Sequence, residues 1–222
     1  MTPPHPTAKP EPASAPAIAR RGLMLVVSSP SGAGKTTITR TLLQQERAQL
    51  ELSISATTRA RRSSEVDRVH YHFMSEDDFV ARIERGQFLE HAEVHGNRYG
   101  TPKEPVERAL SAGKDVLFDI DWQGAAQVRE VARADMVGVF ILPPSMAELE
   151  SRLRRRAQDS EQVIQRRLAA ASDEIRRWVD YDYVIVNDDL DTAMTQIRSI
   201  LEAERLRRQR QTGLEDFVSQ FL

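Results

Sequence analysis

The stretch Ser29-Pro30-Ser31-Gly32-Ala33-Gly34-Lys35-Thr36 decides the fold of this chain. It follows the apolar run Leu23-Met24-Leu25-Val26-Val27 and opens a segment with helical character. A strand, a loop of small residues ending in Gly-Lys-Thr, and a helix form a site for the phosphates of a nucleoside triphosphate. The backbone N–H groups of the loop and the positive end of the helix hold phosphate oxygens. Lys35 can reach the β- and γ-phosphates, and the Thr36 hydroxyl can take a Mg²⁺ position.

One position of this loop departs from the usual pattern, because Ser29 stands where the first Gly is expected. Serine costs more than glycine there if the position needs a positive φ. The alternative interpretation is a plain Ser/Gly turn before a helix. The rest of the pattern and its strand context favour the phosphate loop.

Short apolar runs alternate with longer helical patterns along the chain. We expect buried strands over 23–27, 116–118, 137–142 and 183–186, and helices over 36–49, 103–112, 125–134 and 147–156. Nearly continuous apolar strands separated by helices indicate an α/β fold, with a P-loop NTPase-type parallel sheet covered by helices on both faces. Ser145 with Glu148 predicts a capping box, and Thr101 before Pro102 predicts an N-cap and a first helical position.

Composition limits the partners of the protein. Its 222 residues carry 33 acidic and 31 basic side chains, so there is no overall basic field and we expect no nucleic-acid partner. No apolar stretch approaches the ~18 residues of a membrane span, so we expect no membrane partner. The chain has no cysteine, which excludes disulfides and thiolate metal sites and allows a reducing compartment.

The first twenty residues are rich in Pro and Ala and carry few large apolar side chains. Such a segment cannot bury enough surface to offset its ordering entropy, so we expect a disordered tail over 1–20. It has no apolar signal-peptide core, and we expect a cytoplasmic protein.

Residues 57–65, Thr57-Thr58-Arg59-Ala60-Arg61-Arg62-Ser63-Ser64-Glu65, cluster guanidinium groups near a carboxylate. Arginine forks bind phosphate bidentately, and a neighbouring carboxylate can orient a fork. A solvated basic loop is the alternative. Beside a phosphate loop, and followed by Tyr71, the cluster becomes a candidate second phosphate site.

Asp119 and Asp121 follow a buried strand, at the sheet edge where ligands bind in this fold class. Asp119 could hold Mg²⁺ through a water, and either carboxylate could contact substrate. The alternative role is a helix N-cap, which we judge less suited to Asp121 because Trp122-Gln123-Gly124 intervenes.

A third group is basic: six arginines lie on two helical stretches within 145–170, namely Arg152, Arg154, Arg155, Arg156, Arg166 and Arg167. Phosphoryl transfer needs positive charge around the transferring group. We expect most of them to be solvated and two or three to be functional.

His91, Glu93 and His95 alternate on one face, but neighbouring strand positions rarely complete a metal coordination shell, and we predict no metal site there.

Taken together, the ordered motifs resemble the guanylate kinase family from about Gly22 to beyond Asp191. The matching elements are 30–36, Ser55-Ala56-Thr57-Thr58-Arg59 with Arg62 and Glu65, 70–73, Phe88-Leu89-Glu90, Tyr99-Gly100-Thr101, 119–124, 143–145 and Val186-Asn187-Asp188-Asp189. Many NTPases share the phosphate loop, whereas the ordered combination is specific to this family. Ser64 and Ala157 stand where the family usually has Gly.

The resemblance implies transfer of a phosphoryl group from ATP to GMP with Mg²⁺. It also implies core segments over 21–54, 101–144 and 171–222, the last with the C-terminal helices, a GMP-binding lobe over 55–100, and a lid over 145–170. The partner is then the small molecule GMP. The apolar stripe after Gly213, which includes Phe217 and Phe221, leaves a homo-oligomer open.

The family's functional positions carry over residue by residue. For GMP they are Ser55, Arg59, Arg62, Tyr71, Glu90, Tyr99, Thr101 and Asp121. For ATP they are Ser31, Gly32, Ala33, Gly34, Lys35, Thr36, Thr37 and Asn187, and the catalytic cations are Lys35, Arg152, Arg156 and Arg167. Guanine offers N1–H and N2–H₂ donors on one edge, which a carboxylate can accept as a pair, whereas adenine would leave that carboxylate unpaired.

Three alternatives stay open. A non-enzymatic binding module of the same family need not keep phosphate chemistry, yet Lys35, Thr36 and the lid arginines are present. A regulatory GTPase would need an Asn-Lys-x-Asp motif, which the chain lacks. A kinase for another small molecule shares the core, and only its substrate would distinguish it.

Overall fold

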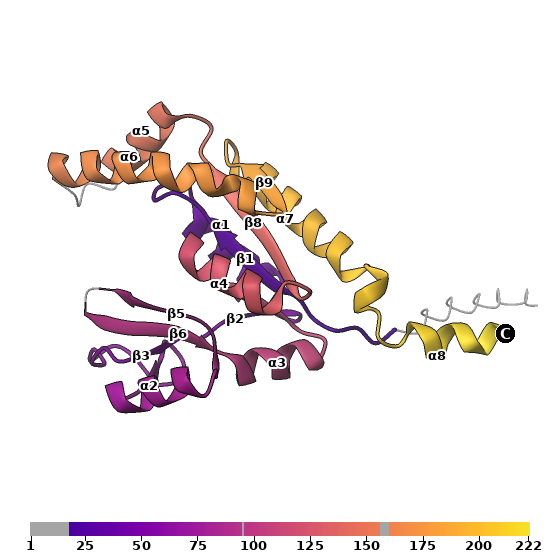
Figure 1. Cartoon of the computed structure of the whole chain (residues 1–222). Helices are drawn as coiled ribbons and strands as arrows, with labels where there is room; N and C mark the ends of the chain where they lie inside the picture. The colour runs from indigo at the N-terminus through magenta and orange to yellow at the C-terminus, as the bar shows by residue number, and fades with distance from the viewer. Residues whose placement is uncertain (1–17, 95, 156–159) are drawn as a thin grey trace, which may run out of the picture.

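The computed structural model describes residues 18–94, 96–155 and 160–222 (Figure 1). Its centre is a five-stranded sheet in the order β2-β7-β1-β8-β9, with every pairing parallel. The strands of this sheet are β1 (Met24–Ser28), β2 (Leu50–Leu52), β7 (Asp115–Phe118), β8 (Met136–Leu142) and β9 (Tyr183–Val186). The predicted α/β fold is confirmed.

Helices cover both faces of this sheet because the side chains of β1 alternate between them. Leu23, Leu25 and Val27 pack with α1 (Lys35–Gln45) and α7 (Leu190–Arg205). Met24 and Val26 pack on the other face with α3 (Lys103–Ser111) and α4 (Trp122–Ala132). The β1 run is buried throughout, so the loop that follows it starts from a fixed position.

A second, smaller sheet has the order β4-β3-β6-β5. Its strands are β3 (Ala56–Thr57), β4 (His72–Phe73), β5 (Phe88–Val94) and β6 (Asn97–Pro102), and α2 (Glu76–Glu84) packs on it. Its own core is small: Ala56, Phe79 and Phe88 are buried together. We call this sheet with α2 the lobe.

Two helices, α5 (Met146–Arg155) and α6 (Glu161–Ile175), form a separate pair. Figure 1 shows this pair at the top of the molecule and the lobe at the bottom. Leu149, Leu153, Ile164 and Ala171 make a cluster between the two helices. We call α5 and α6 the helical pair. The Ser145 hydroxyl accepts the backbone N–H of Glu148 at 3.1 Å, which confirms the Ser145 half of the predicted capping box, while the Glu148 carboxylate accepts from Arg152 and Arg155.

The remaining elements are α8 (Leu214–Val218) and three short 3₁₀ helices, η1 (Arg176–Asp180), η2 (Arg208–Arg210) and η3 (Ser219–Phe221). Phe217 packs edge-on against Phe221, and Phe221 is exposed. In Figure 1, α8 lies away from the central sheet. None of the helices within the described residues is both long and apolar enough to cross a membrane.

Three local expectations were wrong. The first predicted helix ends at Gln45, and a short strand, Leu50–Leu52, follows it and pairs with β7. The N-cap of α3 is Pro102 and not Thr101, whose hydroxyl bonds elsewhere. The predicted tail runs too far: residues 1–17 lie outside the described residues, but Arg20 forms an ion pair with Asp115 at 2.7 Å.

Asp115 is completely buried and draws two distant parts of the chain together. Its carboxylate accepts from Arg20 near the start of the described chain, from Arg205 at the end of α7 at 2.7 Å, and from the backbone N–H of Leu23. A buried carboxylate is tolerated when it is paired and hydrogen-bonded in this way.

Candidate active site

The phosphate loop joins β1 to α1 at the carboxyl end of the sheet. Gly32 and Gly34 have φ of 96° and 101°, a region that favours glycine. Ser29 has no positive φ, because Arg68 is the only non-glycine residue with one in the described part of the chain. The replacement of the usual first Gly by Ser29 therefore costs no left-handed strain.

Asn187 and Arg152 hold this loop from two sides. The Asn187 side-chain amide donates to the carbonyl oxygen of Ala33 at 2.7 Å. Arg152 donates to the Asn187 carbonyl at 3.1 Å and reaches the Ala33 carbonyl at 3.5 Å. A methyl group on Gly34 would lie 2.2 Å from the Asn187 amide nitrogen, so only glycine fits there.

The helical pair packs directly on the loop. A methyl group on Gly32 would approach Leu149 and Leu153 to 3.0 Å. A cavity of about 360 Å³ lies beside the loop and is lined in part by Thr37, Arg152 and Asn187. Its size falls in the range of small-molecule sites.

Lys35 forms an ion pair with Asp119, which follows the neighbouring strand β7. Burial lowers the pKa of Lys35, and the negative charge of Asp121 opposes that shift. Asp121 is the N-cap of α4: its carboxylate accepts the backbone N–H groups of Gln123 at 3.0 Å and Gly124 at 2.9 Å. Asp121 thus caps a helix, contrary to the expectation from its sequence neighbours.

Glu90 on β5 is a buried carboxylate, with 7% of its surface exposed. The Thr101 hydroxyl donates to Glu90 Oε1 at 2.7 Å, because β5 and β6 pair these two residues directly. Burial raises the pKa of Glu90, the bond from Thr101 lowers it, and the charge of Asp121 raises it further. The charge of Asp121 therefore raises the pKa of both Lys35 and Glu90.

Arg59 is the centre of an aromatic and acidic cluster in the lobe. It pairs with Glu65 at 2.7 Å, and its guanidinium lies 5.5 Å from the ring centre of Tyr71. Tyr71 in turn packs edge-on against Tyr99 at 6.0 Å. The bond to Glu65 raises the pKa of Arg59, and a bond with Tyr99 adds to this. An oriented fork between aromatic rings suits a phosphate.

The expected site residues thus fall into three groups: the loop with Asn187 and Arg152, the Glu90–Thr101 pair, and the Arg59 cluster. Thr36 and Thr37 are exposed in the first turn of α1. Ser55 is half-buried on the linker before β3, and Arg62 is exposed, its backbone N–H donating to Glu65. Arg167 is half-buried on α6, while Arg156 lies outside the described residues.

Three residues of the site were missed by the sequence argument. Glu148 accepts from Arg152 at 2.8 Å, and the i,i+4 spacing could have revealed it. Glu174 on α6 accepts the backbone N–H of Ser31, and no local pattern marks it. Gln127 on α4 bonds to the backbone N–H and carbonyl of His91, which ties the lobe to the core.

No group of three or more His, Cys, Asp or Glu side chains that could hold a metal occurs within 18–94, 96–155 and 160–222. His95, one member of the alternating His91, Glu93 and His95 set, lies outside these ranges.

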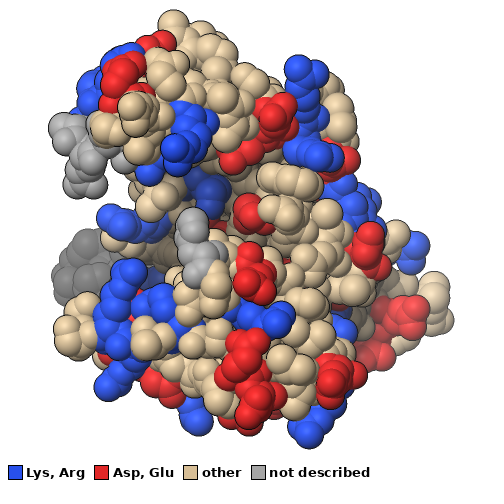
Figure 2. Space-filling view, turned by 60° about the vertical axis from the view of Figure 1, so that its left-hand side comes forward, with Lys and Arg blue, Asp and Glu red and all other residues tan. Residues whose placement is uncertain are grey.

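Figure 2 shows a hollow between the upper part of the molecule, which holds the helical pair, and the lower part, which holds the lobe. Lys and Arg side chains lie on both sides of this hollow. A parallel sheet with a phosphate loop, a lysine on that loop and cationic walls defines a nucleotide-binding protein of the phosphate-loop class.

Comparisons with known proteins give the family. A family model described as guanylate kinase matches residues 21–204. A guanylate kinase of Rhizobium johnstonii is 60% identical over 214 residues, covering 96% of this chain and 97% of that protein. One of Agrobacterium fabrum is 58% identical over 205 residues, covering 92% and 93%. The crystal structure of guanylate kinase from Anaplasma phagocytophilum superposes with a TM-score of 0.69 at 38% identity, covering 91% of this chain and 96% of that one. The chain belongs to the guanylate kinase family.

Proposed function

We propose that the protein transfers the γ-phosphoryl group of ATP to GMP and releases ADP and GDP. The observation that carries this is the Glu90 carboxylate, which is buried beside Thr101 in a chain that also has a phosphate loop. Such a buried carboxylate in the lobe can accept further donors from a ligand, and the guanine edge supplies a pair of them.

On the GMP side, one Glu90 oxygen is already bonded to Thr101, and the second would accept from guanine. Asp121 would add a second acceptor for the base, and the half-buried Ser55 a hydroxyl. Arg59, Tyr71 and Tyr99 would hold the phosphate, with Glu65 keeping the guanidinium in place and Arg62 joining from the exposed loop.

On the ATP side, the N–H groups of residues 31–36 and the start of α1 would hold the phosphates. Arg152 and Asn187 line the cavity beside this loop, so the adenosine part fits there. Lys35, Arg152 and Arg167 would stabilise the charge on the transferring group, with Arg156 as the expected fourth cation.

Magnesium fits the donor set of the site. The exposed Thr36 hydroxyl, phosphate oxygens and waters are the hard oxygen ligands that Mg²⁺ takes, and Asp119 can join through a water. When bound, Mg²⁺ would neutralise charge on the ATP phosphates. ATP and GMP are solutes of the cytoplasm, and we propose that the protein works there, as a monomer or a homo-oligomer.

The lobe over 55–100 and the lid over 145–170 would close over the two nucleotides. This follows because the cations that must meet one phosphoryl group come from three separate segments: the loop, the lobe and the helical pair. Closure would also keep water from the phosphoryl group.

A coupled assay of ADP release with GMP, AMP, CMP and UMP tests the function. We expect turnover with GMP and at least about 10²-fold lower kcat/KM with AMP, since adenine leaves Glu90 unpaired. Equal rates with GMP and AMP would overturn the guanine assignment. ATP consumption that is independent of any monophosphate would overturn the kinase assignment.

A further inference from the structure

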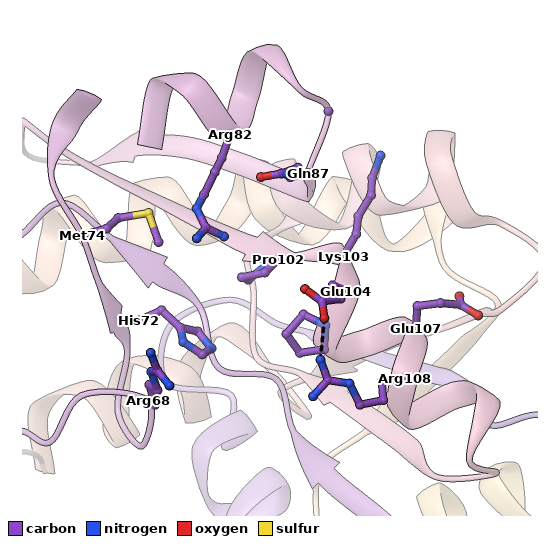
Figure 3. A pocket seen from close by; sticks show the side chains of 12 residues that line it. Arg68, His72, Met74, Arg82, Gln87, Pro102, Lys103, Glu104, Glu107 and Arg108 are labelled. Carbon is purple, nitrogen blue, oxygen red and sulfur yellow. Dashed lines mark hydrogen bonds and ion pairs between the residues drawn. The ribbon is translucent and has the colours of Figure 1, made fainter. Parts of the chain in front are cut away.

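A second cavity of about 740 Å³ lies where the lobe meets α3 (Figure 3). Its walls come from both parts: Arg68, His72, Met74 and Arg82 from the lobe, and residues 102–105, 107 and 108 from the end of β6 and α3. The proposed reaction uses none of these side chains.

This cavity lies on the opposite face of β4 from the Arg59 cluster. Tyr71 and Phe73 both face Arg59, whose guanidinium lies 5.5 and 5.9 Å from their ring centres. Successive side chains of a strand point to opposite faces, so His72 and Met74 face away from Arg59. A ligand in the second cavity would therefore not occupy the proposed GMP phosphate site.

The cations of the cavity are not equally engaged. Arg108 is paired with Glu104 at 2.6 Å. Arg82 has no ion pair among the described residues, and Arg68 has only a long one, 3.7 Å to Asp67. Figure 3 shows Arg82 extending from α2 towards Pro102 and His72, while Lys103 points away. Two guanidinium groups without a close ion pair among the described residues thus line the same cavity.

The floor between these arginines is apolar, formed by Met74, Pro102 and Pro105 with the His72 ring. A smaller cavity of about 160 Å³ shares His72, Pro102 and Pro105 with it and reaches Ser53. The Ser53 hydroxyl is buried and has no hydrogen-bond partner among the described residues. Buried hydroxyls are normally paired, so this one is available to a polar atom that enters the smaller cavity.

We propose that this cavity is a second ligand site, which takes a phosphorylated small molecule with a flat apolar part. The phosphate would lie between Arg82 and Arg68, whose forks match phosphate oxygens. The flat part would lie on Met74, Pro102 and Pro105. An apolar pocket with a few convergent polar groups, of this volume, is the usual form of a small-molecule site.

Binding of 1-naphthyl phosphate tests the proposal. The binding is measured by calorimetry and by the NMR signals of the His72 ring, which are assigned by comparison with the His72→Asn variant. The titrations use the full chain, once alone and once with GMP and a non-hydrolysable ATP analogue in excess. We expect saturable binding and a His72 shift in both, with weaker binding of inorganic phosphate and of 1-naphthol. Arg82→Ala should raise the Kd at least tenfold.

Arg85→Ala is the matched control, because Arg85 lies three residues further on and does not line the cavity. It should leave the Kd unchanged, and thermal melts should show that both variants fold. Equal Kd values for the two alanine variants, or no saturable His72 shift, would overturn the site. If inorganic phosphate binds as tightly as the aryl phosphate, the proposal that the ligand has a flat apolar part is wrong. These readouts do not depend on GMP turnover, so they separate this site from the proposed function.

Discussion

The lobe and the helical pair each carry an arginine that we expect to bind phosphate, but they hold it differently. In the helical pair, Arg152 already touches the phosphate loop through the Ala33 carbonyl. In the lobe, Arg59 is held by the lobe's own carboxylate, Glu65, and by Tyr71. The expected cation of the helical pair therefore already lies at the loop, whereas the expected phosphate-binding cluster of the lobe is held within the lobe itself.

The two regions also differ in how they are attached to the core. The helical pair rests on Gly32 through Leu149 and Leu153. The lobe is tied to the core at its inner strand, where Gln127 bonds to the backbone of His91 and Glu90 lies near α4. We therefore infer that closure moves the outer part of the lobe more than the helical pair.

The largest effect is expected at the point on which both regions converge. Lys35→Ala should lower kcat by about 10³-fold or more, because in the proposed reaction this lysine would stabilise the charge of the transferring phosphates. The fold should survive, since Lys35 is the first residue of α1 and its side chain lies outside the apolar clusters. Steady-state assays with GMP and a thermal melt check this. Near-normal turnover would contradict the phosphate-loop assignment.

The lobe's contribution is tested at the base. Glu90→Gln keeps the size of the side chain but turns one acceptor oxygen into a donor amide that faces a guanine donor. The loss should be ~2–4 kcal/mol in kcat/KM for GMP. KM for ATP should hardly move. Unaltered GMP kinetics would remove Glu90 from base recognition.

The helical pair is tested at Arg152. Arg152→Ala should lower kcat about 10²-fold, because it removes a cation held at the phosphate loop. Arg154→Ala is the control, since Arg154 is paired with Glu150 and Glu161 on the exposed side. If both variants lose the same activity, Arg152 acts through the stability of the helices and not at the phosphates.

The inferred difference in movement can be measured directly. GMP and a non-hydrolysable ATP analogue together should protect both regions from proteolysis more than either ligand alone, and the lobe should gain more protection than the helical pair. The core strands should change little. Solution scattering should show compaction. Without compaction or added protection, closure would have to be abandoned and only the binding sites kept.

The smallest effect concerns stability and pH. Burial raises the pKa of Glu90 above its ordinary 4.5, so the folded, ligand-free protein holds this proton to higher pH than the unfolded chain. The stability linked to Glu90 is then complete below about pH 4.5 and is lost as pH rises through the folded pKa. Glu90→Gln should therefore melt at a higher temperature than the parent at pH 7–8, with the gap closing towards pH 4. A lower melting temperature at pH 8 would contradict this sign.

Sequence alone predicted the features that rest on local pattern. The loop after a buried strand and the strand Tyr183–Val186 are where the pattern places them, because a short apolar run between helical patterns favours a strand of the parallel sheet. The expected burial of this strand was wrong: it lies at the edge of the sheet, and Val184 and Val186 are 40% and 50% exposed. Leu50–Leu52 was missed because three residues are too short to show a period and the strand exists only through its pairing with β7.

The site shows the same division. Thr101 was expected to cap α3, a local role, but the β5–β6 register sets it opposite Glu90, and no window of sequence contains that register. Asp121 was judged a poor cap, yet its carboxylate takes the N–H groups of the next turn. The ligand roles of these residues stay predictions, since they depend on molecules that bind between distant segments.

The buried Asp115 also has a consequence for shortening the chain. Its carboxylate forms ion pairs with both Arg20 and Arg205, so one buried side chain links the two ends of the core. A truncation that keeps Arg20 preserves both ion pairs. One that begins at Arg21 leaves a fully buried charge with one guanidinium fewer, and loosens the end of α7 as well as the start of β1.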